Sequence, residues 1–218
     1  MTMASLIEYK GKRPVLGERV FIAEGAKVIG DVEIGDDSSV FYNAVIRADL
    51  AEIRIGKRTN IQDNVTIHLS TGVGVHVGDN VTVGHNAILH ACDVDDNVLV
   101  GMGAILMDGV HIKCNSVVAA GAIVTQDKEF PEGSLIVGAP ARVVRELTED
   151  EIRKFHENAE HYLIVKDELM KNGWRMMEID EMDMLGFLRL RAWDAQREHE
   201  KKKPRHAFID EVWSTVKP

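Results

Sequence analysis

Three of the nine histidines, His68, His85 and His90, are of the right type to hold a metal ion together. Imidazole nitrogen binds zinc, iron and cobalt, and three protein ligands leave one coordination position open for water, which is typical of a catalytic site. Ligand nitrogens lie about 2.1 Å from the metal, yet the stretch from His85 to His90 spans up to ~16 Å when extended. The fold therefore has to bring these side chains together.

A six-residue period indicates which fold this is. Between residues 22 and 129 an aliphatic residue recurs at every sixth position, interrupted by two short insertions and one deletion. The seventeen positions are Ile22, Val28, Ile34, Val40, Ile46, Ile55, Ile61, Ile67, Val77, Val83, Leu89, Val94, Val100, Leu106, Ile112, Val118 and Val124. A period of six is neither the 3.6 of a helix nor the alternation of a sandwich or barrel strand. It is typical of a triangular coil with one short strand on each side and small residues at the corners.

The sequence therefore predicts a left-handed parallel β-helix of hexapeptide repeats within residues 1–146. The coils are expected to end near Lys128, where prolines and glycines mark an extended crossing segment. The capping box Thr148–Glu151 predicts a helix within residues 147–172, whose apolar face should lie along the coils. Residues 173–218 form a further extension, for which packing is favoured over ligand binding.

Stacking of the coils places one set of outward side chains in a column. Every third hexad falls on the same side of the prism, so the residues that follow Ile46, Ile67 and Leu89 lie one above another. These residues are Arg47, His68 and His90. Two histidines in one column favour a metal site over separately solvated side chains.

The third histidine belongs to a different column. His85 lies on the preceding side of the prism, above Asp63 and beside Gln62. Outward side chains on two sides of a convex corner diverge, so a single chain holds one metal poorly. A ring of three subunits, in which the His68/His90 column of one chain faces His85 of the next, satisfies the geometry.

Composition and charge exclude several other classes of function. A net charge of −9 argues against nucleic acid as a partner. The two cysteines, Cys92 and Cys114, are read as free thiols of a reducing compartment. The N-terminus lacks the apolar run of a signal peptide, and no stretch reaches membrane-spanning length. We therefore expect a cytoplasmic protein without a membrane partner.

Several segments resemble the γ-class carbonic anhydrases and their relatives. They are Val45–Asp49, Asn60–Asp63, Val83–Cys92 and Val137–Ala141, and the resemblance covers roughly residues 12–170. It implies a homotrimer with one metal at each subunit interface, held by His68, His85 and His90. The metal implied is zinc, with iron or cobalt as alternatives, and the implied substrate pair is CO₂ and bicarbonate.

The resemblance also implies roles for four other residues. Gln62 would orient the attacking hydroxide, and Arg47 would hold bicarbonate or pair with Asp49 or Asp63 across the interface. A purely structural set of ion pairs is an equally open reading of Arg47, Asp49 and Asp63. Tyr162, on the C-terminal helix, would approach the metal, with simple packing as the alternative.

One departure from the family pattern bears on catalysis. The archetype carries a proton-shuttling glutamate in an acidic loop after the first histidine, whereas Leu69–Val75 is short and holds no carboxylate. The leading hypothesis is metal-dependent reversible hydration of CO₂ to bicarbonate. An acyl-CoA thioesterase or acyltransferase, or a non-catalytic metal-binding trimer, remains as the alternative.

Overall fold

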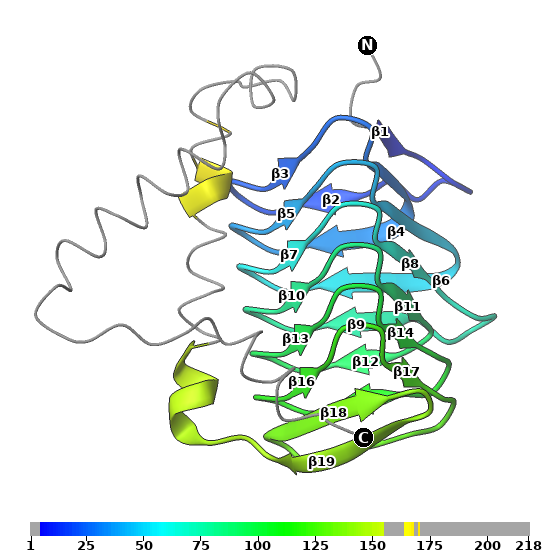
Figure 1. The fold of residues 1–218 in the computed structure, drawn as a ribbon. Coiled ribbons are helices and arrows are strands. Elements are labelled where there is room, and N and C mark those ends of the chain that lie inside the picture. The colour runs from blue at the N-terminus through cyan, green and yellow to red at the C-terminus, as the bar shows by residue number, and fades with distance from the viewer. Residues whose placement is uncertain (1–4, 155–163, 168–169, 171–218) are drawn as a thin grey trace, which may run out of the picture. The chain divides into compact units, whose positions relative to one another are not determined.

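The chain winds into stacked triangular coils of short parallel strands, as a computed structural model describes it for residues 5–154, 164–167 and 170 (Figure 1). The prediction of a left-handed parallel β-helix is confirmed. Two continuous sheets make up its three faces, because the long strands β4 (Lys27–Ile34) and β6 (Val45–Ile55) turn a corner and belong to two faces at once.

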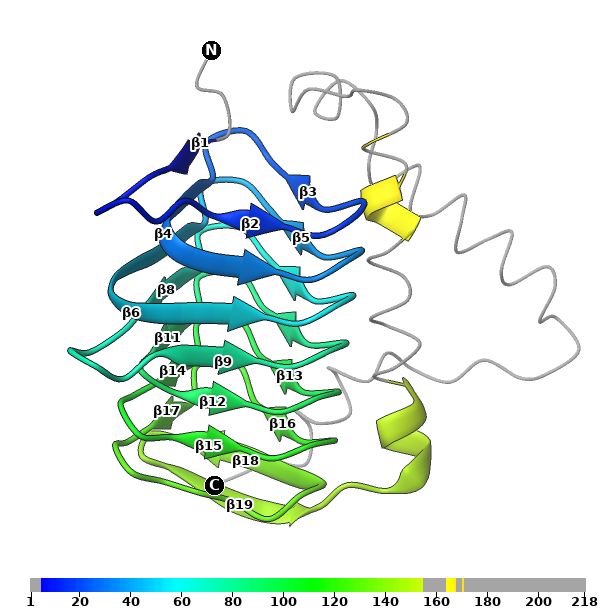
Figure 2. The same cartoon turned by 180° about the vertical axis from the view of Figure 1, so that it is seen from behind.

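The remaining strands are distributed over the three faces. The first face holds β1 (Ser5–Ile7), β8 (Thr66–His68), β11 (Ile88–His90), β14 (Ile105–Leu106) and β17 (Ile123–Val124). The second face, seen in Figure 2, holds β2 (Val15–Leu16), β9 (Val75–Val77), β12 (Asp93–Val94) and β15 (His111–Ile112). The third face holds β3 (Phe21–Ile22), β5 (Ser39–Val40), β7 (Asn60–Ile61), β10 (Thr82–Val83), β13 (Leu99–Val100), β16 (Val117–Val118) and β18 (Ser134–Gly138), with β19 (Ala141–Glu146) beside it.

The coil continues further than the six-residue period indicated. The crossing segment expected after Lys128 contains β18, which pairs in parallel with β16 and completes the third face, before β19 returns antiparallel to it. Phe130 and Ile136 are both buried and keep the six-residue spacing after Val124. The six-residue series was counted from aliphatic residues only, so it stopped at Val124, before the aromatic Phe130.

The core is a stack of the aliphatic residues that define the period. Sixteen of the seventeen are buried, and Ile22 in the first coils is half-buried. Parallel pairing sets them directly above one another, as in the ladder that joins Ile46 to Ile67 and Ile67 to Leu89. Burying one such side chain contributes roughly 1.5–3 kcal/mol. This stacking holds the register of every coil.

Corners between the second and third faces are built from glycine for a steric reason. A Cβ atom at Gly56 would lie 2.6 Å from the carbonyl group of Gly78 in the next coil. The close approach lets the carboxylate of Asp79 accept a hydrogen bond from the Lys57 amide at 2.7 Å. Small corner residues therefore permit the tight stacking that the core requires.

The segment after the coils begins with the predicted capping box. The Glu151 amide donates to the Thr148 hydroxyl at 3.3 Å, and the Thr148 amide donates to the Glu151 carboxylate at 2.9 Å. Arg145 of β19 also binds Glu151, and that hydrogen bond is the main reason why the pKa of Glu151 falls to about 2. Residues 149–154 are helical, so the predicted helix start is confirmed.

A second described helical piece, residues 164–167, contacts the other end of the coil. The Lys166 ammonium group is buried and donates to the Asp37 carboxylate at 3.1 Å and to the Arg19 carbonyl at 3.3 Å. Tyr162 and the extension 173–218 lie outside the described residues. Among those that are described, no helix is long and apolar enough to cross a membrane.

We predict that Ile112→Ala, at a fully buried position of the core stack, lowers the free energy of unfolding by about 2–5 kcal/mol, because it leaves a cavity that rigid coils cannot fill. Ile164→Ala, the same substitution at a side chain that is 52% exposed, should change it by less than about 0.5 kcal/mol. Urea denaturation of both variants is the measurement. Equal losses would mean that burial of the aliphatic stack does not dominate stability.

Candidate functional site

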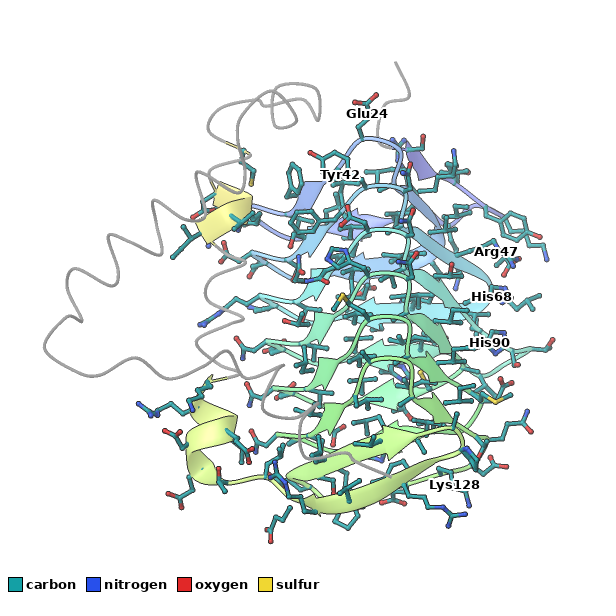
Figure 3. The ribbon with its side chains drawn as sticks, viewed as in Figure 1. Glu24, Tyr42, Arg47, His68, His90 and Lys128 are labelled. Atoms are coloured by element: carbon teal, nitrogen blue, oxygen red, sulfur yellow. The ribbon has the colours of Figure 1, made fainter. Side chains whose placement is uncertain are left out.

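The first two histidines lie side by side on the first face. His68 ends β8 and His90 ends β11, and the two residues are paired in the parallel ladder. Their inward neighbours Ile67 and Leu89 are buried, so strand alternation turns both imidazoles outward. The Nδ1 atom of His68 lies 3.2 Å from the Nε2 atom of His90. Figure 3 shows Arg47, His68 and His90 one above another, as the count of hexads predicted.

A carboxylate from the coil below engages the other nitrogen of His68. Asp49 Oδ1 lies 3.1 Å from His68 Nε2, and Asp49 Oδ2 pairs with the Arg47 guanidinium group. Burial raises the pKa of Asp49, but the hydrogen bonds from His68 and Arg47 outweigh it and hold that pKa below its usual value. An ionised carboxylate only accepts hydrogen bonds. The proton of neutral His68 therefore sits on Nε2, and Nδ1 presents its lone pair.

A second carboxylate, from the coil above, does the same for His90. Asp108 Oδ1 lies 2.6 Å from His90 Nδ1, and the Ser70 hydroxyl donates to Asp108 Oδ2. The hydrogen bond from Ser70 is the main reason why the pKa of Asp108 is lowered, with a further contribution from His90. The proton of neutral His90 therefore sits on Nδ1, and Nε2 presents its lone pair toward His68.

His85 lies at the corner between the third and first faces, with a carboxylate of its own. Its Nδ1 atom is 2.8 Å from Asp63 Oδ2, and Asp63 Oδ1 accepts a hydrogen bond from the Tyr42 amide at 3.2 Å. The backbone amide of His85 donates to Gln62 Oε1 at 3.1 Å, and Gln62 is almost fully buried. The structure therefore places Asp63 under His85, with Gln62 beside it, as predicted.

These donors fit a metal ion, although one chain does not gather all of them. The Nδ1 atom of His68 and the Nε2 atom of His90 face each other at 3.2 Å. When both rings are neutral, each nitrogen presents a lone pair there, and the two lone pairs repel each other unless a cation lies between them. Two nitrogens bound to one tetrahedral metal at about 2.1 Å lie roughly 3.4 Å apart, so the separation is close to that of shared ligands. Over the described part of the chain, no three His, Cys, Asp or Glu side chains meet as a metal cluster, so His85 stands apart.

Comparison with known proteins places the chain in a family. The hexapeptide repeat of succinyl-transferase matches residues 52–91 and 94–126. Gamma carbonic anhydrase 2 of Arabidopsis thaliana is 43% identical over 165 residues, which cover 73% of this chain and 59% of that protein. The probable carbonic anhydrase of Methanocaldococcus jannaschii is 50% identical over 155 residues, covering 71% of this chain and 98% of the relative. The chain belongs to the γ-class carbonic anhydrase-like family of hexapeptide-repeat proteins.

Solved structures show that this family fold also occurs under another description. A Bacillus cereus protein described as a candidate acetyltransferase superposes with a TM-score of 0.74 and 38% identity, covering 75% of this chain and 95% of that one. The γ-class fold is therefore shared by proteins described by different reactions. The site, and not the fold, has to decide between them.

Sequence reasoning missed Asp108, which binds His90, together with the Ser70 hydroxyl that holds it. Asp108 follows the inward-facing Leu106 by two residues, one coil above His90. On the face of His68 and His90 only the position directly after each inward residue was counted, so Asp108 was passed over. Arg47 pairs with Asp49 of its own chain, whereas the predicted pairing with Asp49 or Asp63 was across the interface and stays a prediction. Tyr162 lies outside the described residues.

We predict that Asp63→Ala destabilises the metal-free protein by about 1–3 kcal/mol, because the half-buried Tyr42 amide loses its acceptor. Asp63→Asn keeps an oxygen that can accept from the Tyr42 amide, so its free energy of unfolding should fall clearly less. Urea denaturation with chelator present measures both. Equal losses would assign the effect to the charge beside His85 instead of to the amide.

Proposed function

We propose that the chain forms a homotrimer which catalyses the reversible hydration of CO₂ to bicarbonate at a metal site on each subunit interface. The observation that carries this proposal is the 3.2 Å approach of His68 Nδ1 and His90 Nε2, with the other ring nitrogen of each histidine on an aspartate. Proteins at 43% and 50% identity that are named carbonic anhydrases support the same reaction. Zinc is the proposed metal, with iron or cobalt also suited to three imidazoles.

His85 completes the proposed ligand set from the neighbouring subunit. Its Nδ1 is engaged by Asp63, so Nε2 is the nitrogen available for a ligand bond. All three histidines then have the same form, with one nitrogen on a carboxylate and the other on the metal, which orients the ring and raises its basicity. A metal held by His68, His85 and His90 would supply hydroxide at neutral pH, because three protein ligands leave one position for water.

Gln62 and Arg47 serve the substrate in this proposal. Because Gln62 Oε1 accepts the His85 amide, only the NH₂ side of its amide remains to donate to an oxygen beside His85. The Arg47 guanidinium group is held by Asp49, which also binds His68, so its remaining N–H groups lie beside the same site and can hold bicarbonate. Both residues thus position oxygen atoms at the edges of the site.

The interface site predicts complementation between two inactive variants. His85→Ala and His90→Ala should each abolish metal binding when expressed alone. A trimer that mixes the two variants regenerates one interface with all three histidines. Co-expression at equal levels should therefore restore zinc at about one quarter of all interfaces, and at about one third of the interfaces in mixed trimers. Metal analysis of the doubly tagged protein is the measurement, and no recovery at all in verified mixed trimers would contradict a site shared between chains.

The catalytic roles predict a separation of metal content from turnover. Gln62→Ala and Arg47→Ala should keep zinc at the wild-type level but lower CO₂ hydration by roughly a hundred- to a thousandfold. Arg54→Ala is the matched control, since Arg54 binds Asp31 on the second face and should leave activity unchanged. Stopped-flow hydration assays on protein loaded with zinc, or anaerobically with iron, are the test. Unchanged rates in both site variants would remove these roles.

Acyl-CoA chemistry is the second candidate, because the Bacillus cereus relative is described as an acetyltransferase. A groove of about 570 Å³ runs along the second face past Arg54 and His76, but its lining includes none of His68, His85 and His90. Acyl-CoA hydrolysis by a protein without hydration activity would favour this candidate.

Since Leu69–Val75 holds no carboxylate, an anhydrase should turn over faster as imidazole buffer is added. A cytoplasmic location stays a prediction, and the Arabidopsis relative is named mitochondrial.

A further inference from the structure

We infer that Asp108 and Ser70 form a positioning pair that sets which nitrogen of His90 faces the metal. The inference rests on the proposed metal site and assigns it two residues beyond the three ligands. Neither residue would touch the metal or the substrate. Both would act through His90.

The geometry gives Asp108 two separate partners. One carboxylate oxygen accepts from His90 Nδ1 at 2.6 Å, and the other accepts from the Ser70 hydroxyl. The carboxylate is therefore held at both oxygens and cannot rotate without losing one hydrogen bond. A ring held in this way keeps its Nε2 atom directed at His68.

Ser70 is itself held by the short loop that follows the first histidine. Leu69 is buried in the core, and the Ser70 carbonyl accepts a hydrogen bond from the Val73 amide at 3.1 Å. The loop leaves His68 and reaches the aspartate of His90. A serine hydroxyl here therefore links the surroundings of the two histidines that one chain contributes.

The charge of Asp108 matters as much as its shape. An aspartate can only accept, which keeps the His90 proton on Nδ1, whereas an asparagine of equal size can donate to Nδ1. Donation would move the proton to Nε2 and remove the lone pair that a metal needs. Asp108→Asn therefore tests the tautomer with little change in packing.

The chain offers a matched control on another face. His76 Nδ1 lies 2.7 Å from Asp93 Oδ1, the same pairing of an aspartate with a histidine at the surface of the second face. Asp93→Asn changes the same chemistry away from the proposed site. It should leave zinc affinity within about twofold of the wild type, because Asp93 contacts none of the three proposed ligands.

The experiment is a competition titration of zinc against a chromophoric chelator, with the full chain and with each variant. Asp108→Asn should bind zinc about 10- to 100-fold more weakly. Ser70→Ala should bind zinc about two- to tenfold more weakly. Ser70→Thr, which keeps the hydroxyl, should recover most of that affinity. With cobalt in place of zinc, the visible absorption band should change in Asp108→Asn and not in Asp93→Asn.

The outcomes separate this inference from the proposed function. Wild-type protein that binds no zinc would overturn both. Zinc bound tightly by the wild type and equally tightly by Asp108→Asn would overturn the positioning pair alone. Urea denaturation of the metal-free variants tests for a merely structural role. Such a role would lower the free energy of unfolding without changing the cobalt spectrum. If Asp108→Asn fails to fold, the comparison of Ser70→Ala with Ser70→Thr decides, and equal zinc affinities there would overturn the inference.

Discussion

Parallel stacking of aliphatic side chains inside the prism is the constraint on which the other features depend. A strand in this ladder cannot slip by one residue, because the slip would turn Ile67 and Leu89 outward and drive His68 and His90 into the core. Since each buried aliphatic side chain contributes roughly 1.5–3 kcal/mol, such a slip is strongly disfavoured. The positions of the outward imidazoles are therefore a consequence of core packing, and the site needs no separate element to align it.

The stack aligns the histidines but does not fix which ring nitrogen each of them leaves free. One nitrogen of each imidazole is engaged by an aspartate one coil away: Asp49 below His68, Asp63 below His85 and Asp108 above His90. Vertical pairing of this kind is available only in a fold where the coils repeat at a constant spacing. It lets an acidic side chain of one coil set the hydrogen-bonding state of a basic side chain in the next.

The sequence was sufficient for the features that depend on period and register. The faces, the column of Arg47, His68 and His90, and the position of Asp63 under His85 all follow from counting hexads. Hydrogen bonds made by corners and loops were not accessible in this way. Asp108 has a hexad position, two residues after Leu106, but it lies in a turn, where the count does not give the direction of the side chain. Ser70 reaches it from a loop of irregular length, which has no hexad position.

The two attachments of the C-terminal segment have a consequence for how such a chain can evolve. Repeat folds readily gain or lose whole units by duplication, because each unit contacts only its neighbours. Here Glu151 is bound to β19 beside the last coil, and Lys166, only fifteen residues later, is buried against Arg19 and Asp37 of the first coils. An added coil would lengthen the prism by ~4.8 Å and would move these two attachment points apart by the same distance. The number of coils is thus coupled to the separation of Glu151 and Lys166, so a duplication that the coils alone would tolerate also changes a distance that the C-terminal segment has to span.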